Sequence, residues 1–387
     1  MNVFEMDHEY VANTYARFPV NIVEGKGSIL KDETGKEYID LGSGIAVNSF
    51  GTADEKWIGA VTAQLHAFQH TSNLFYTQPC AQLAQKLCQR TGMKKVFFSN
   101  SGAESNETAI KAAREYASLT KGPDCYTIVS LKNSFHGRTL ATLAATGQDT
   151  FHQHFGPMPQ GFVSIDPTTE ALEEVVKTTK VAGIMFEAIQ GEGGIQPLNP
   201  EFVWNMARIA KEHDIVLIAD EVQCGNGRSG KLYAYMNYAV QPDVVTTAKG
   251  IGGGLPIGVT MLGEKVQDVF KPGLNGSTFG GNPVCCAGAI SILDRIDDAL
   301  MSQVAEKSKY IFQELSGAKG VESVSGMGLM IGVKPVKSTP EVVAKCREKG
   351  VLVLTAKDKL RLLPPLNIPF EQLKQAVAVL KSVCGED

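Results

Sequence analysis

The sequence predicts an α/β protein with a mainly parallel central sheet, because short apolar runs alternate with helical stretches along it. The runs are KVFFS (95–99), CYTIVSL (125–131), AGIMFE (ending at Glu187), IVLIAD (215–220) and DVVTTA (243–248). Each has the length of a strand and lacks polar alternation, which is typical of strands buried on both faces. Such strands, separated by helices, occur in parallel sheets that are covered on both sides. GVTMLG (258–263) is a further candidate strand, for which an antiparallel direction remains open.

The two ends of the chain differ in pattern from its middle. VEGKGSILKDETGKEYID predicts an extended hairpin that turns at Thr34-Gly35, and helical periodicity begins at about residue 55. Near residue 285 the long helical stretch VCCAGAISILDRI leads into further helices and strands that end in RLLPPLNIP. We therefore expect an N-terminal segment (1–50) that packs with a small α+β C-terminal domain (285–387), and a large domain (51–284) between them.

Composition limits the classes of function. The chain has 387 residues, enough to bury a large core without disulfides, and a net charge of −4. That charge gives no broad positive field to attract nucleic acid or a membrane surface. The N-terminus has no apolar stretch typical of a signal peptide, and no run approaches the ~18 apolar residues needed to span a bilayer. Eight cysteines without a CxxC pair are typical of thiols in a reducing compartment, so a cytoplasmic protein is expected.

A small-residue turn follows the first predicted strand. Ser101, Gly102 and Ala103 come directly after KVFFS, and a helix is expected from Glu104 onward. The free N–H groups of a helix N-terminus, together with a hydroxyl, form a cradle for phosphate. A plain capped helix without a ligand is the alternative.

Two charged residues lie at the ends of later strands. Asp220 closes IVLIAD, where a buried carboxylate needs a partner such as a protonated pyridine nitrogen or Mg²⁺. Lys249 follows DVVTTA and precedes a glycine-rich stretch. Desolvation there would lower the pKa of its amine and free it for Schiff-base chemistry. A lysine that reaches solvent is the other interpretation.

Phe135 and Arg138 follow the strand CYTIVSL in the segment SFHGRT. The phenyl ring is suited to stacking on an aromatic cofactor, and the guanidinium to binding a carboxylate through two hydrogen bonds. A core phenylalanine and a surface arginine are the alternatives. A phosphate cradle, a ring stacker, a strand-end aspartate and a strand-end lysine together are what pyridoxal 5′-phosphate requires, and this combination predicts that cofactor.

Two other patterns are weaker. Residues 225–230 match GxGxxG, but a four-residue insertion separates them from the strand, and the following segment is too short for the crossover helix of a dinucleotide site. His66 and His70 are spaced as ligands on one helix face, yet no third ligand is evident, so no metal is expected. GEGGIQP (191–197) is expected to form a loop at the edge of the active site.

Over nearly its whole length the chain resembles the class III aminotransferases of fold type I. The resemblance rests on NSGAESNE, SFHGRT, ADEVQCGNGRSG, TTAKGIGGGLPIG and GSTFGGNP. It implies a large domain with a mainly parallel sheet, a smaller α+β domain, and pyridoxal 5′-phosphate held as a Schiff base by Lys249. It also implies a homodimer with shared active sites. The implied cofactor contacts are Ser101, Gly102 and Ala103 at the phosphate, Phe135 on the ring face, Asp220 at the ring nitrogen, Gln223 near the ring hydroxyl, and Thr278 reaching the phosphate from the partner subunit.

Substrate residues are implied by the same resemblance. Arg138, with Ser277 nearby, resembles the arginine that binds a substrate carboxylate, and Arg361 the arginine that binds the α-carboxylate of glutamate. Glu187 resembles the glutamate that pairs with Arg361 when the other substrate is bound, and Tyr15 lies in a region that lines the same pocket.

The implied reaction is transfer of the terminal amine of N2-acetylornithine to 2-oxoglutarate. Succinylornithine, ornithine and 4-aminobutyrate are alternative amine donors. A nicotinamide-dependent dehydrogenase and a non-enzymatic cofactor-binding protein are alternatives of other classes. The sequence departs from the family where FGTADEKW stands in place of GHxHP, which predicts a changed loop near the pocket or the dimer edge.

Overall fold

A seven-stranded sheet forms the centre of the computed structural model, which describes residues 1–386. The strand order is β4-β12-β11-β10-β7-β5-β6, and only β12 runs antiparallel to its neighbours. The strands are β4 (Lys95–Ser99), β5 (Thr127–Leu131), β6 (Phe162–Ile165), β7 (Val181–Phe186), β10 (Val216–Asp220), β11 (Val244–Thr247) and β12 (Gly258–Leu262). The predicted mainly parallel sheet is confirmed, and each predicted run forms a strand. The sequence did not predict β6, an edge strand that is only partly buried and therefore lacks a continuous apolar run.

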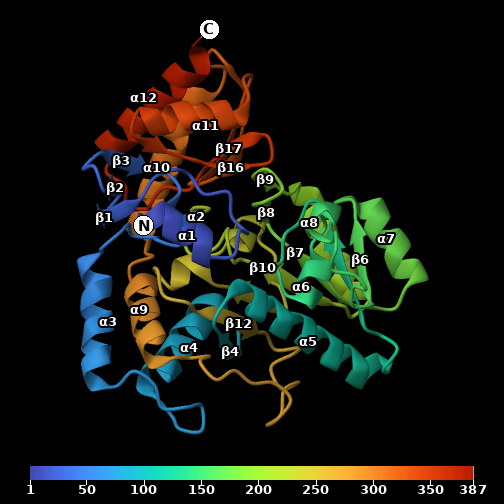
Figure 1. Ribbon diagram of the computed structural model, residues 1–387. Coiled ribbons are helices and arrows are strands. Elements are labelled where there is room, and N and C mark those ends of the chain that lie inside the picture. Colours follow the sequence, from blue (N-terminus) through green and yellow to red (C-terminus); the bar gives the residue numbers. More distant parts are fainter. Residues whose placement is uncertain (387) are drawn as a thin grey trace.

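Both faces of this sheet are covered. In β10, Val216 and Ile218 belong to one apolar cluster, whereas Leu217 and Ala219 belong to the other, because successive side chains point to opposite faces. The first cluster includes α5 (Gly102–Lys121), and the second includes α8 (Pro200–Glu212). Figure 1 shows the sheet between these helices. Burial on both faces leaves the strand ends as the places where polar side chains reach solvent or a ligand.

The N-terminal segment pairs with the C-terminal part of the chain. A four-stranded sheet joins β1 (Ile22–Lys26), β2 (Ile29–Asp32) and β3 (Glu37–Asp40) to β15 (Val351–Leu352), which lies parallel to β3. The β2–β3 turn holds Thr34 and Gly35, as predicted, and the Asp32 carboxylate accepts a hydrogen bond from the backbone N–H of Thr34 (2.9 Å). The domain boundaries at residues 50 and 285 stay a prediction.

A second four-stranded sheet lies in the C-terminal part of the chain, in the upper part of Figure 1. Its strands are β13 (Val321–Met327), β14 (Met330–Pro335), β16 (Leu354–Ala356) and β17 (Lys359–Leu362), and its helices are α10 (Asp298–Leu315), α11 (Thr339–Glu348) and α12 (Phe370–Gly385). The remaining elements are α1 (Val3–Tyr10), α3 (Glu55–Ala67), α4 (Gln78–Thr91), α6 (Leu140–Ala145), α7 (Thr169–Thr178), α9 (Pro283–Leu293), the two-residue strands β8 (Ile189–Gln190) and β9 (Gln196–Pro197), and the short turns α2 (Ser43–Ala46), η1 (Asp149–Phe151), η2 (Ala234–Tyr238) and η3 (Lys249–Ile251). Within residues 1–386, no helix has the length and apolar character of a membrane span.

The segment FGTADEKW forms a tight loop and the start of α3. Asp54 caps α3 through the backbone N–H of Trp57 (2.9 Å) and forms an ion pair with Arg295 (2.8 Å). The indole N–H of Trp57 donates to the carbonyl of Gly252 (3.0 Å). The loop that departs from the family pattern thus contacts the glycine-rich stretch that follows Lys249.

Candidate active site

A cavity of about 460 Å³ opens at the carboxyl ends of the central strands. Its volume lies within the roughly 300–1,000 Å³ of small-molecule sites. The predicted site residues that line it are Ser101, Gly102, Ala103, Phe135, Arg138, Glu187, Asp220, Gln223 and Lys249. They come from the segments that follow β4, β5, β7, β10 and β11, so the strand-end residues meet in one place, as predicted for an open α/β sheet.

Lys249 starts the short turn η3 directly after β11. Burial, aided by the positive charge of Arg361, lowers the pKa of its amine below the ordinary value, although nearby carboxylates oppose the shift. A lower pKa makes the neutral, nucleophilic form more abundant. The lysine is therefore placed and tuned for reaction with a carbonyl group.

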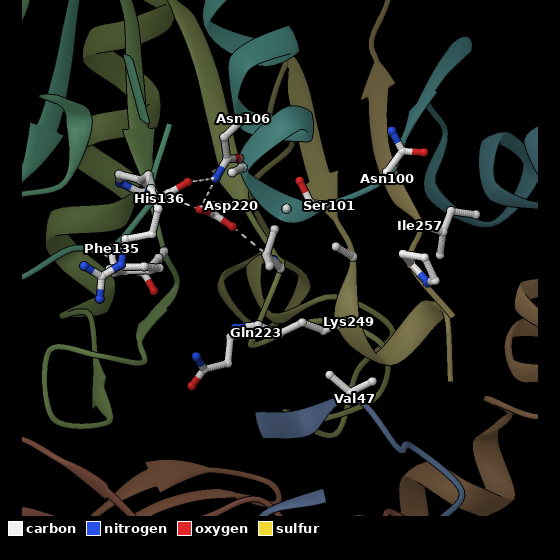
Figure 2. A pocket seen from close by; sticks show the side chains of 18 of the residues that line it. Val47, Asn100, Ser101, Asn106, Phe135, His136, Asp220, Gln223, Lys249 and Ile257 are labelled. Atoms are coloured by element: carbon white, nitrogen blue, oxygen red, sulfur yellow. Dashed lines mark hydrogen bonds and ion pairs between the residues drawn. The ribbon is translucent and has the colours of Figure 1, made fainter. Parts of the chain in front are cut away.

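Asp220 is held by a network at the bottom of the cavity. Its Oδ2 accepts a hydrogen bond from Asn106 Nδ2 (2.7 Å) and lies 2.8 Å from His136 Nδ1, and its Oδ1 accepts one from the backbone N–H of Val222 (3.0 Å). Figure 2 shows Asp220 between His136 and Asn106. A carboxylate offers about four lone-pair sites, so one remains for a ring nitrogen in the cavity. The residues present fit a pyridine ring.

His136 and Asn106 are the members of this network that the sequence motifs did not single out. His136 lies inside the segment SFHGRT, between the two residues that were chosen, and Asn106 lies one helical turn after the phosphate turn. The hydroxyl of Thr246 on β11 donates to Asn106 Oδ1 (2.7 Å), which fixes the orientation of the amide. The only hint in the sequence was a polar residue, Asn106, one turn inside a predicted helix. Its partner Asp220 is 114 residues away, so the sequence did not predict their contact.

The start of α5 forms the phosphate end of the cavity. The hydroxyl of Ser101 accepts a hydrogen bond from the N–H of Glu104 (3.2 Å) as the helix cap, while Gly102 and Ala103 occupy the first helical positions, whose N–H groups have no intrahelical acceptor. A Cβ on Gly102 would lie 2.6 Å from Val222 Cγ1, so the close approach requires glycine. This arrangement supplies backbone donors and a positive helix end for an anion.

Ser277 and Thr278 lie beside this end of the cavity rather than in it. Ser277 Oγ accepts hydrogen bonds from Asn100 Nδ2 (3.2 Å) and from the N–H of Gly280 (3.0 Å). Asn100 lines the cavity, whereas Thr278 is exposed and faces solvent in the single chain. This position agrees with its predicted action on a partner subunit, which stays a prediction.

The acidic partner of Arg361 is Glu192, not Glu187 as predicted. Arg361 Nη1 forms an ion pair with Glu192 Oε1 and donates to Gln223 Oε1 (3.3 Å). Glu192 lies in the loop between β8 and β9, which faces Arg361 on β17, whereas the loop GEGGIQP was expected only to border the site. Although burial opposes it, the charge and hydrogen bond of Arg361 lower the pKa of Glu192.

Glu187 lines the cavity but binds backbone groups instead of Arg361. Its carboxylate accepts hydrogen bonds from the backbone N–H groups of Phe135 (2.9 Å) and Gly191 (3.2 Å). Burial, aided by the nearby charge of Asp220, raises its pKa to about 7, although His136 and the two hydrogen bonds oppose the shift. Glu187 therefore connects the segment of the ring stacker to the loop that carries Glu192.

Arg138 and Tyr15 occupy different surroundings. Arg138 is exposed at the cavity and stacks over Phe151 (4.4 Å from the ring centroid) and Phe135 (5.5 Å). Tyr15 is 70% exposed and lines a separate cavity formed by the N-terminal segment. The prediction that Tyr15 lines the pocket of Lys249 is therefore wrong for the single chain, because Tyr15 belongs to the lining of the other cavity only.

The GxGxxG segment serves the fold. Arg228 within it is fully buried and donates to the backbone carbonyls of Leu329 (3.2 Å) and Pro364, which ties the segment to the C-terminal part of the chain. His66 and His70 do not belong to any group of three metal-ligating side chains in the described part of the chain.

The buried carboxyl of Glu187 predicts a pH dependence of stability. A carboxyl whose pKa rises from the ordinary 4.5 to about 7 on folding binds more protons in the folded chain than in the unfolded one. The stability it contributes is present below pH 4.5 and is lost as pH rises through about 7, by up to about 1.4 kcal/mol per pH unit. Urea unfolding between pH 4.5 and 8 should show a flatter profile for Glu187→Gln than for the wild type. The surface variant Glu174→Gln is the control, and parallel profiles for Glu187→Gln and wild type would contradict the expectation.

Comparison with known proteins agrees with this geometry. A family model described as aminotransferase class-III matches residues 10–384. An acetylornithine aminotransferase of Haemophilus ducreyi is 47% identical over 385 residues, which cover 99% of this chain and 98% of the relative. The solved ornithine aminotransferase of Toxoplasma gondii is similar with a TM-score of 0.93 at 31% identity, covering 98% of this chain and 94% of that one. The N-acetylornithine aminotransferase of Stenotrophomonas maltophilia gives 0.86 at 32% identity, covering 98% of each chain.

These matches confirm the predicted fold type I and set aside the dehydrogenase alternative. Pyridoxal 5′-phosphate is the cofactor of this fold family, and the cavity, the helix N-terminus, Asp220 and Lys249 fit it. The chain belongs to the class III aminotransferases.

Proposed function

We propose that this aminotransferase transfers the terminal amino group of N2-acetylornithine to 2-oxoglutarate, giving N-acetylglutamate 5-semialdehyde and glutamate. The observation that carries the proposal is a pair of arginines near Lys249. Arg138 lines the same cavity and is free of an acidic partner among the described residues, whereas Arg361 is close enough for its charge to lower the pKa of Lys249 and is neutralised by Glu192. Two substrates with different carboxylates can use such a pair in turn. The names of the relatives support the choice of amine donor, and the proposed place of the reaction is arginine biosynthesis.

The cofactor contacts follow from the same geometry. Pyridoxal 5′-phosphate, held covalently through Lys249, supplies an aldehyde carbon that exchanges amines and a ring that withdraws electrons. Gly102 and Ala103 would donate their N–H groups to the phosphate, with Ser101 beside them. Asp220 would accept a hydrogen bond from the ring nitrogen and keep it protonated, while Phe135 covers the ring face and Gln223 lies near the ring hydroxyl.

Lys249 has a second role as the general base and acid. With its pKa lowered by burial, its amine is able to take a proton from Cδ of the substrate, the carbon that carries the transferred amino group. Arg138 would hold a substrate carboxylate near the mouth of the cavity, beside Ser277.

The pair of Arg361 and Glu192 sets the alternation between substrates. While paired, Arg361 offers no free charge, so a substrate that approaches with its terminal amine is not held by its α-carboxylate at the wrong end. When Glu192 moves away, Arg361 binds the α-carboxylate of glutamate, and the α-amino group then reaches Lys249. The change exchanges one charge-assisted ion pair of Arg361 for another, so its net free energy is small.

The substrate assignment is tested by kcat/KM for N2-acetylornithine, succinylornithine, ornithine and 4-aminobutyrate with 2-oxoglutarate. We expect N2-acetylornithine to exceed ornithine by more than about tenfold, and a ping-pong rate law. Lys249→Ala should lose the absorbance of the covalently held cofactor, and its turnover should fall by about 10²–10⁴-fold, whereas the exposed-lysine control Lys271→Ala should retain both. A preference for ornithine or 4-aminobutyrate would replace the assignment, and retention of activity in Lys249→Ala would remove it.

Glu192→Gln tests the alternation. Loss of the carboxylate charge leaves Arg361 free, so the amine donor binds in unproductive orientations and its kcat/KM should fall about tenfold, while that of glutamate changes little or rises. Single-turnover rates of the two half-reactions measure the ratio. Glu174→Gln is the control, because Glu174 is exposed outside the cavity and should leave this ratio unchanged. Equal effects of Glu192→Gln on both half-reactions would contradict the proposal.

We further propose a homodimer with shared active sites. Leu74 (89% exposed), Phe75 (68%) and Phe279 (60%) form an apolar surface beside Thr278. Asn73 Nδ2 ties their two segments together through the carbonyls of Ser277 (2.9 Å) and Gly280 (2.8 Å). An exposed apolar surface of this kind is typical of an interface.

A cytoplasmic location agrees with the absence of disulfides among the described cysteines.

Sedimentation at micromolar concentration should give a dimer, because burying this surface stabilises association. Phe75→Glu should shift the equilibrium toward monomer and lower cofactor affinity, since Thr278 would lose its site across the interface. Trp204→Glu, which changes an exposed aromatic residue (56%) outside this surface, is the control. A wild-type monomer with full activity would overturn the dimer.

A further inference from the structure

Lys249 has an unfavourable backbone conformation. Its φ is +45°, in the left-handed region that residues with a Cβ seldom occupy. Strain of this kind persists only where the surroundings determine it, and it is concentrated at active sites. The turn itself supplies two weakly constraining backbone bonds, from Ile251 N to Ala248 O (3.2 Å) and from Gly252 N to Lys249 O (2.9 Å). Other groups must therefore hold the peptides on both sides of Lys249.

Two buried side chains do so. Asn226 Nδ2 donates to the carbonyl of Ala248 (3.2 Å) and to the hydroxyl of Thr247 (2.9 Å), which fixes the peptide that precedes Lys249. Ser49 Oγ donates to the carbonyl of Gly250 (2.9 Å), which fixes the turn after it. Ser49 is 1% exposed and Asn226 2% exposed, so no bulk water is able to replace either donor.

Ser49 and Asn226 pack closely against Gly250, with no room for a side chain between them. A Cβ on Gly250 would lie 2.7 Å from Ser49 Oγ and 3.2 Å from Asn226 Cβ. Ser49 is also held from its other side, because its carbonyl accepts a hydrogen bond from the N–H of Leu366 (2.8 Å), five residues after Arg361. Ser49 thus links the turn of Lys249 to the segment that carries the substrate arginine.

We propose that Ser49 and Asn226 are positioning residues, which hold Lys249 in its strained turn so that its amine enters the cavity at one place relative to Arg361. The inference rests on the proposed role of Lys249 as the attachment point of the cofactor. Neither residue lines the cavity, so neither is expected to touch cofactor or substrate. Without the two donors, the turn relaxes toward ordinary dihedral angles and the amine samples several positions.

The test measures how fast the apoprotein captures pyridoxal 5′-phosphate at Lys249, followed by absorbance and confirmed by borohydride reduction and peptide mass spectrometry. Ser49→Ala and Asn226→Gly each remove a donor, and glycine avoids added strain because Asn226 itself has φ +56°. Each should slow capture about tenfold, equivalent to about 1.4 kcal/mol. Both should also weaken the visible circular dichroism of the bound cofactor, which reports the angle between its ring and the lysine.

Ser130→Ala is the matched control, because Ser130 is 1% exposed and its hydroxyl has no hydrogen-bond partner among the described residues. A merely structural role predicts that the Ser49 and Asn226 variants lose thermal stability while capture rate and circular dichroism stay at the wild-type and Ser130→Ala values; that result overturns the inference. If borohydride fixes the cofactor to Lys249 in the wild type, the proposed attachment stands whatever the variants do. If it fixes the cofactor to another lysine in the wild type, both the attachment and the positioning role are overturned.

Discussion

Charged groups at the carboxyl edge of the central sheet lie largely out of water, and each needs a partner there. Asp220 meets this need with Asn106, His136 and a backbone N–H, and keeps one acceptor site for the cofactor. Arg361 meets it with Glu192. Lys249 forms no ion pair with any of the described residues, and burial lowers the pKa of its amine. Charges that are fully paired within the protein hold the site together, whereas charges that keep a free acceptor or donor are available to a ligand.

The carboxyl groups around the cavity have two different roles: some hold loops in place, and one pairs with a substrate-binding side chain. Glu221, beside Asp220, accepts hydrogen bonds from the N–H groups of Ala234 and Tyr235 (both 2.7 Å), and burial raises its pKa to about 7. Glu187 does the same for the segments of Phe135 and Gly191. Glu192, by contrast, is paired with the side chain of Arg361. Backbone-bound carboxyls fix loops, whereas the carboxyl that is bound to another side chain is the one suited to exchange.

The sequence was sufficient for those features that local pattern determines. The strands and their ends follow from apolar runs, so Lys249, Asp220 and the turn at Gly102 were placed correctly in one cavity. The partner of Arg361 was not predictable, because Glu187 and Glu192 lie in the same short segment and only the path of the chain between β7 and β9 decides which one faces β17. Asn106 and His136 contact Asp220 only because tertiary packing brings their segments together, so the sequence did not predict these contacts. The exposure of Tyr15 depends on an N-terminal segment that packs weakly on the rest of the single chain.

The parallel pairing of β3 with β15 has a consequence for how the enzyme forms. Some three hundred residues separate the two strands, so their union is among the most non-local contacts in the fold and carries a large loop-closure cost. On a ribosome, residues 37–40 emerge long before their partner at 351–352 is made, and the stretch that holds Ser49 waits with them. The central sheet is able to assemble first from neighbouring strands, leaving a cavity whose reactive lysine is not yet braced. With Ser49 in the proposed positioning role, we expect catalytic competence to be a late event in the maturation of the chain, which delays amine chemistry until synthesis is nearly complete.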